Sequence, residues 1–413
     1  MFEGNRAASS RISRGSVRRQ FLGALIIGAL ISALSVGSPG ADAVKKRPRL
    51  KPKVSVAPAA TTLPAMPKDV LALAEVGPLT VGLTTADVRR DAVMFKTDVW
   101  YPAVAPSPTE RLAPVTYDVK DWLPAAALAK VGDAAVATYQ TRAIRDRASL
   151  PGPYPVVLFS HGFGGYRMQS SDLMQQLASW GFVVIAPEHT DRDLPAVLAD
   201  PTAFGHGDAA DLSAVLAAVR SKTLVPGPLA ASLDPVNIAV MGHSAGANAA
   251  ISLSATDTRL KGVIALGGGA SGLLGRIPEQ AAPILWVAAG NDSVFPLGTV
   301  TAAAAATKAT HHLVTVDASG HMVFADICEI GKDRGGPVGI AKSLGVVVPF
   351  TLQLLGTDGC NPPNAPVTTA WPIVRFAVVA QLRTIFQPGS KSVLTQANLD
   401  ALVGRGAVKA TLG

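Results

Sequence analysis

The sequence is poor in cysteine, in aromatic residues and in charge. Of its 413 residues only two are cysteine, 5% are aromatic and 16% are charged. Two cysteines exclude a disulfide-rich scaffold, and a hydrophobic share of 48% excludes a disordered or collagen-like chain. The length allows one large α/β domain with additional segments, or two smaller domains, and either has room for a sizeable core.

The formal net charge of +8 is confined to the N-terminal part. Residues 1–53 hold 11 of the 37 basic residues and two of the 29 acidic ones, which leaves 26 basic and 27 acidic residues in 54–413. A domain that binds nucleic acid needs clustered Lys and Arg to neutralise phosphates. We therefore expect no nucleic-acid partner.

Residues 1–43 have the three parts of an export signal. A basic stretch ends with Arg18 and Arg19, an uncharged apolar run covers 21–36, and Ala41-Asp42-Ala43 offers a cleavage site after Ala43. The paired arginines resemble a twin-arginine signal, and an ordinary Sec signal stays open. As a helix the apolar run would rise only ~24 Å, less than a bilayer core of ~30 Å, which argues against a retained anchor. The sequence predicts a secreted or extracytoplasmic protein.

Segment 44–75 is predicted to be a basic, proline-rich linker without a periodic apolar face. Its basic residues could make weak contact with an anionic cell envelope, although a solvated leader is the simpler interpretation.

Beyond the linker, short apolar runs alternate with helix-length segments. This alternation predicts an α/β fold with a mainly parallel central sheet flanked by helices. The expected strands are 93–101, 156–160, 182–186, 236–241, 262–266, 284–288 and 313–316. The expected helices between them are 169–180, 207–220, 245–254 and 299–309.

A Gly-His-Ser-Ala-Gly motif at 242–246 lies between an expected strand and an expected helix. This context is typical of a nucleophile elbow, in which glycines permit a tight turn that displays the serine at the strand's carboxyl end. Ser244 is therefore the candidate nucleophile. A serine hydroxyl needs a nearby base and an orienting carboxylate to react at neutral pH.

His321 is the candidate base among seven histidines. It follows the last expected strand and fits the chain order Ser, Asp, His of this architecture. His243, the neighbour of Ser244, is expected to point away from the site. Asp292, on the loop after strand 284–288, is the candidate acid, with Asp317 and Asp326 as competitors close to His321 in the sequence.

Two backbone N–H groups must stabilise the oxyanion of an acyl-transfer intermediate. Ala245, the residue after the nucleophile, supplies one. The other is expected from the glycine-rich segment 160–165, Ser-His-Gly-Phe-Gly-Gly, with Phe163 as the donor. A phosphate-binding loop is disfavoured because the spacing is not G-x-G-x-x-G.

These motifs, together with segments 155–167 and 186–193, resemble the α/β-hydrolase superfamily. The branch is that of platelet-activating-factor acetylhydrolase-like, dienelactone-hydrolase-like and cutinase-like secreted esterases. The resemblance covers residues 78–325 and 372–386, and it implies a serine esterase without a metal or an organic cofactor.

The sequence departs from that branch at two places. Acetylhydrolase-like members place their acid after the strand that here ends in glycines at 267–269, so Asp292 follows the cutinase-like arrangement. Polyester-degrading relatives usually have Met at the position of Ala245 and Trp where these glycines stand, and Phe163 alone remains of their aromatic clamp. Polyester cleavage is thus a minor alternative.

The segment after His321, 325–370, is unusually long and contains both cysteines. In an exported protein we expect Cys328 and Cys360 to form a disulfide, which would stabilise the fold by about 3 kcal/mol. The apolar interior of the segment suggests a lid or a pocket wall, and packing on the sheet edge is nearly as plausible. A second insertion, 102–150, shows no recognisable chemistry.

The predicted organisation is therefore a signal peptide at 1–43, a linker at 44–75, a hydrolase domain at 76–390 with insertions 102–150 and 325–370, and a C-terminal tail at 391–413. No zinc, EF-hand or clustered Cys/His pattern occurs, so we expect no metal and no cofactor. The predicted activity is hydrolysis of a small-molecule or lipid carboxylic ester (esterase or lipase type) through an acyl-enzyme. A cell-envelope acyltransferase and a non-catalytic binding member of the fold stay open, and the oligomeric state cannot be read from the sequence.

Overall fold

The computed structural model describes residues 62–413 except 134–135, 203–204, 206 and 270–278. The predicted signal peptide and most of the predicted linker lie outside these residues. Among the helices described, none is both long enough and apolar enough to cross a membrane.

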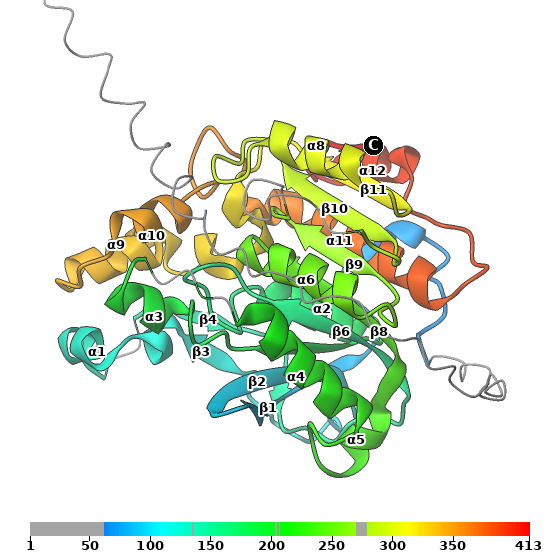
Figure 1. Ribbon diagram of the computed structural model, residues 1–413, viewed down its shortest axis with the longest axis horizontal. Coiled ribbons are helices and arrows are strands. Elements are labelled where there is room, and N and C mark those ends of the chain that lie inside the picture. The colour runs from blue at the N-terminus through cyan, green and yellow to red at the C-terminus, as the bar shows by residue number, and fades with distance from the viewer. Residues whose placement is uncertain (1–61, 134–135, 203–204, 206, 270–278) are drawn as a thin grey trace, which may run out of the picture. The chain divides into compact units, whose positions relative to one another are not determined.

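Ten strands of the described residues form one sheet (Figure 1). Their order is β12 (Ala410–Leu412), β11 (His311–Val316), β10 (Ile284–Ala289), β9 (Val263–Leu266), β8 (Leu233–His243), β6 (Tyr154–Ser160), β7 (Val183–Pro187), β2 (Val93–Ala103), β1 (Thr80–Arg90) and β5 (Ile144–Arg145). The six strands from β11 to β7 are parallel, and the antiparallel β12 and β2 flank them. The predicted mainly parallel α/β sheet is confirmed.

Helices cover both faces of the sheet because alternate strand residues point to opposite sides. In β6, Val157 and Phe159 pack in one core cluster, and Val156 and Leu158 pack in the other. The first cluster is closed by α2 (Ser171–Ser179) and α11 (Val367–Phe386). The second is closed by α4 (Asp208–Arg220), α6 (Ala245–Thr256) and α8 (Leu297–Ala306).

The remaining elements lie in the two insertions, in connecting loops and near the ends of the described chain. The short helices are η1 (Val70–Ala74), η2 (Val119–Trp122), α1 (Ala125–Val131), α3 (Leu194–Ala199), α5 (Gly227–Ser232), η3 (His321–Phe324), η4 (Asp326–Cys328), η5 (Lys332–Arg334), α9 (Gly336–Ser343), α10 (Phe350–Leu355) and α12 (Gln396–Val403). A separate hairpin consists of β3 (Thr116–Asp118) and β4 (Thr138–Gln140). Figure 1 shows α9 and α10 beside each other, beyond the edges of the strands and close to α3.

The structure corrects two predicted boundaries. Residues 391–413, predicted as a tail, form α12 and the edge strand β12, which pairs with β11. The second half of the predicted linker belongs to the domain as well, because Leu73 of η1 is fully buried in the core and Arg383 of α11 donates to the Pro64 carbonyl at 2.7 Å. Short elements of this kind have no long apolar periodicity that would reveal them.

The burial of α12 leads to a test of the first correction. Leu399→Ala should lower the free energy of unfolding by about 2–5 kcal/mol, because it removes a fully buried side chain from a packed core. Val403→Ala, in the same helix but 38% exposed, should change it little. Urea unfolding measures both free energies. An equally small change in the two variants would show that 391–413 is a loosely attached tail.

Candidate active site

Ser244 lies at the turn between β8 and α6. Its backbone has φ 58° and ψ −122°, a conformation that side chains rarely adopt. Glycines are needed on both sides: a Cβ on Gly242 would overlap with the Gly246 carbonyl, and a Cβ on Gly246 would overlap with the Ser160 carbonyl. The turn therefore has the geometry of a nucleophile elbow at the carboxyl end of β8.

His321 and Asp292 meet across the carboxyl ends of two neighbouring parallel strands. Asp292 follows β10 and His321 follows β11, and the His321 Nδ1 lies 2.8 Å from the Asp292 Oδ2. The other carboxylate oxygen accepts the backbone N–H groups of Val294 at 2.8 Å and Phe295 at 2.7 Å. With the Nδ1 proton held by the carboxylate, the Nε2 of the imidazole is left to act as a base.

Ser244 and His321 line one cavity with about 910 Å³ of empty volume, part of which is open to solvent. The glycine-rich loop 162–165 forms its floor, and a Cβ built on Gly162 would lie 3.3 Å from the Ser244 Cβ. Phe163 lines the cavity, and Ala245 is the first residue of α6, whose first amide groups have no partner within the helix. The structure thus brings the predicted nucleophile, base, acid and oxyanion residues together.

His243 does not point away from the site as expected. It is buried and lines the cavity, with its ring centroid 4.6 Å from that of His321. Its Nδ1 lies 2.9 Å from the Gln169 Nε2, and its Nε2 lies 3.2 Å from the His321 carbonyl oxygen. Gln169 in turn accepts the Gly162 N–H at 3.1 Å.

These contacts fix the proton positions on the His243 ring. The Gln169 amide donates to Nδ1, so the ring proton is on Nε2 and is donated to the His321 carbonyl. Burial, followed by the nearby His321, lowers the pKa of His243 well below its usual range, so the ring stays neutral. His243 and Gln169 therefore join the glycine loop to the backbone of His321.

Asp358 is a further site residue that sequence reasoning missed. Its Oδ1 accepts the His321 N–H at 2.6 Å, its Oδ2 accepts the Ser293 N–H at 3.3 Å, and its carbonyl accepts the Met322 N–H at 3.0 Å. One side chain thus holds the loop of the base against the loop of the acid.

The predicted disulfide is present and lies beside Asp358. Cys328 and Cys360 are joined, with their Cα atoms 5.0 Å apart. Gly320 and Gly359 approach so closely that a Cβ on either would overlap with the other's backbone. The disulfide therefore keeps the Asp358 segment pressed on the loop that carries His321.

The two competitor acids have other structural roles. Asp326 accepts the backbone N–H groups of Ser171 at 2.7 Å and Asp172 at 3.2 Å, at the start of α2, and the Tyr117 hydroxyl at 3.2 Å. Burial, with Asp172 nearby, raises the pKa of Asp326 to about 8. Asp317 lies at the end of β11, where its N–H donates to the Lys409 carbonyl at 2.9 Å.

Two comparisons with known proteins bear on the fold. A family model of platelet-activating factor acetylhydrolase, isoform II, matches residues 89–202, which include the glycine-rich loop. The solved structure of a ferulic acid esterase from Streptomyces cinnamoneus is similar with a TM-score of 0.56 and 24% identity, over 78% of this chain and 95% of that one. The structural similarity supports an α/β-hydrolase fold, and the family match covers the part of the domain that carries the glycine-rich loop.

The contact between His321 and Asp292 predicts how Ser244 should react. A fluorophosphonate should label Ser244, and Asp292→Asn should slow the labelling by a factor on the order of 10³–10⁴, because the imidazole loses its orienting carboxylate. Mass spectrometry of the labelled peptide gives the rate. Asp317→Asn is the matched control and should leave the rate close to that of the unchanged protein. The reverse pattern would assign the acid to Asp317.

Proposed function

We propose that the protein is a secreted serine carboxylic-ester hydrolase of the α/β-hydrolase superfamily, a proposal that the fold and the two comparisons support. The observation that carries the proposal is one cavity lined by Ser244 and His321, with the His321 Nδ1 held 2.8 Å from Asp292. Acyl transfer is the chemistry that this combination of nucleophile, base and orienting acid supports.

In the proposed mechanism, the Nε2 of His321 takes the hydroxyl proton of Ser244 while the serine oxygen attacks the ester carbonyl carbon. The N–H groups of Phe163 and Ala245 stabilise the oxyanion. The protonated imidazole, steadied by Asp292, then gives its proton to the departing alcohol, which leaves an acyl-enzyme. His321 next activates a water molecule, which attacks the acyl-enzyme and releases the acid.

The cavity walls favour an ester with an extended apolar group. The insertion 325–370 contributes Val338, Val346, Leu352 and several further aliphatic side chains to the lining. Leu352 of α10 lies directly over the glycine loop, because a Cβ on Gly164 would overlap with it. In this proposal the predicted lid or pocket wall acts as the wall that receives the apolar group.

Export to an oxidising compartment is part of the proposal. The pattern of residues 1–43, which are outside the described part of the chain, supports it, and so does the disulfide, since disulfides persist mainly in oxidising compartments. The mass of the N-terminal peptide of the mature protein tests it, with Val44 expected as the first residue.

The direct test is hydrolysis of p-nitrophenyl esters from acetate to palmitate by the protein without residues 1–43. We expect turnover that disappears in Ser244→Ala, with longer acyl chains preferred over acetate because they fill the apolar cavity. Ester product formed with an added alcohol, in preference to free acid, would instead indicate an acyltransferase. A folded protein that neither turns over nor reacts with a fluorophosphonate would refute the proposal.

The position of α10 predicts a change of selectivity. Leu352→Ala should raise the ratio of kcat/KM for long over short acyl esters by about tenfold, because removing the side chain enlarges the cavity. Leu354→Ala is the matched control, since the same helix presents Leu354 outward at 52% exposure. Equal ratios in the two variants would show that α10 does not contact the acyl chain.

A further inference from the structure

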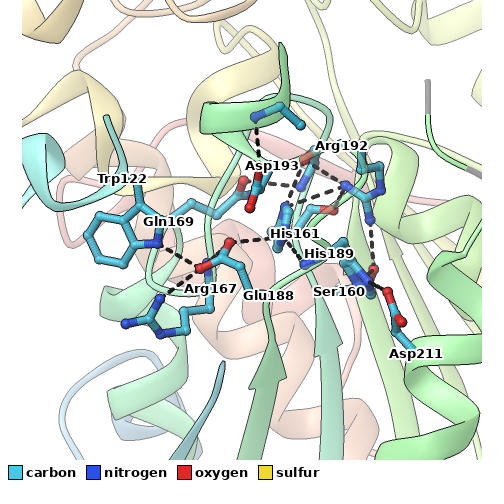
Figure 2. Close-up of polar contacts among 12 residues, drawn as sticks. Trp122, Ser160, His161, Arg167, Gln169, Glu188, His189, Arg192, Asp193 and Asp211 are labelled. Carbon is cyan, nitrogen blue, oxygen red and sulfur yellow. Dashed lines mark hydrogen bonds and ion pairs between the residues drawn. The ribbon is translucent and has the colours of Figure 1, made fainter. Parts of the chain in front are cut away.

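The guanidinium of Arg192 contacts the glycine-rich loop and is almost completely buried. Figure 2 shows it beside His161. Its Nη1 donates to two consecutive carbonyl oxygens of that loop, those of His161 and Gly162, each at 2.7 Å. Its own backbone carbonyl accepts the Gly164 N–H at 2.9 Å. One residue therefore contacts the loop at three points.

The Gly162 carbonyl belongs to the same peptide unit as the Phe163 N–H. In a planar trans peptide the C=O and N–H bonds point in opposite directions. A donor that holds the Gly162 oxygen toward the protein interior therefore directs the Phe163 N–H away from the interior. Gly162 and Phe163 line the cavity together with Ser244, whereas the donors His161 and Arg192 are buried behind the loop, so the opposite direction is that of the cavity.

The Gly162 oxygen has two further donors. The Gly165 N–H lies 3.1 Å away, and the His161 Nδ1 lies 2.9 Å away. The His189 N–H donates to the His161 Nε2 at 3.0 Å, so the proton of the neutral ring is on Nδ1 and points to the Gly162 oxygen. Burial, with Arg192 nearby, lowers the pKa of His161 well below its usual range and keeps this ring neutral. Arg192 is thus the charged donor of the three.

Arg192 is itself held in place by a buried polar chain, visible in Figure 2. Its Nη2 donates to the Ser160 hydroxyl at 3.1 Å, the Ser160 Oγ lies 2.8 Å from the His189 Nε2, and the His189 Nδ1 lies 3.0 Å from Asp211. The order Ser, His, Asp imitates a catalytic triad. Ser160 and His189 have no exposed surface, however, so no substrate can reach them.

The two carboxylates at the end of this series of hydrogen bonds, those of Asp208 and Asp211, are each paired with an arginine. Asp208 accepts a hydrogen bond from the Nε of Arg192, and Asp211 accepts one from the Nε of Arg90 at 2.6 Å. The group formed by His189, Asp208 and Asp211 could in principle hold a metal ion, but the two guanidiniums already supply the positive charge there. The chain serves to fix Arg192.

We propose that Arg192 is a positioning residue for the reaction: its bond to the Gly162 carbonyl orients and polarises the Phe163 N–H as an oxyanion donor. The inference rests on the proposed esterase function. A charge-assisted hydrogen bond to a carbonyl withdraws electron density from the peptide, which strengthens its N–H as a donor. The effect should appear in the transition state, where the oxyanion forms, and not in substrate binding.

The test compares Arg192→Met and Arg192→Lys with Arg383→Met, which removes an equally buried guanidinium elsewhere in the fold, on α11, where it donates to the Pro64 carbonyl. We expect Arg192→Met to lower kcat about 10- to 100-fold, with KM nearly unchanged. This loss should not exceed the decrease in kcat caused by removing an entire oxyanion donor. Arg192→Lys, which keeps a charged donor, should recover part of the loss. Arg383→Met should keep the kcat of the unchanged protein.

A second measurement separates positioning from a general structural effect. In a thionoester the developing charge is on sulfur, a weaker hydrogen-bond acceptor, so the rate depends less on the oxyanion donors. The ratio of oxoester to thionoester turnover should therefore fall in both Arg192 variants and stay constant in Arg383→Met. If Arg192→Met fails to fold, Asp208→Asn replaces it, because this variant weakens the contact that holds the Arg192 guanidinium. The ratio of oxoester to thionoester turnover should fall in Asp208→Asn as well.

The outcomes distinguish the two proposals. An active wild-type protein whose Arg192 variants keep kcat and the oxoester to thionoester ratio would overturn the role of Arg192 alone. A wild-type protein that neither hydrolyses esters nor reacts with a fluorophosphonate would overturn the proposed function, and this inference with it.

Discussion

The hydrogen bond between His321 and Asp292 joins two loops that the parallel sheet brings together. The loops are 29 residues apart in sequence but follow the adjacent parallel strands β10 and β11, whose carboxyl ends share one edge. The register between these strands sets the separation of the two side chains. The order of strands, the packing of helices on both faces and the edge strand β12 therefore all contribute to holding a single 2.8 Å contact.

Around this contact the site is supported by side chains that hold segments of backbone in place. Asp358 binds the backbone of His321, and Gln169 and His243 connect that backbone to the glycine loop. Beneath the loop, Arg192 holds the carbonyls from the interior. Buried polar groups are costly unless they are paired, and here the pairing is used to fix backbone positions instead of adding stability alone.

The parts of the structure that could be predicted are those with a local sequence signal. The strand, turn and helix around Ser244 were predicted because apolar runs and two glycines stand next to each other. His321 and Asp292 were predicted from their places after strands. The disulfide was predicted because the sequence contains two cysteines. Asp358 and Gln169 were missed because their partners are 37 and 74 residues away, and no pattern in one sequence links such positions.

The disulfide between Cys328 and Cys360 has a consequence beyond the stability of the insertion. It closes the segment in which Asp358 grips the backbone of His321. When the disulfide is reduced to two thiols, the segment is tethered only by its ends and its packing, and the hold of Asp358 on the backbone of His321 weakens. The position of His321, a residue that carries no sulfur, thereby becomes sensitive to the redox state of its surroundings.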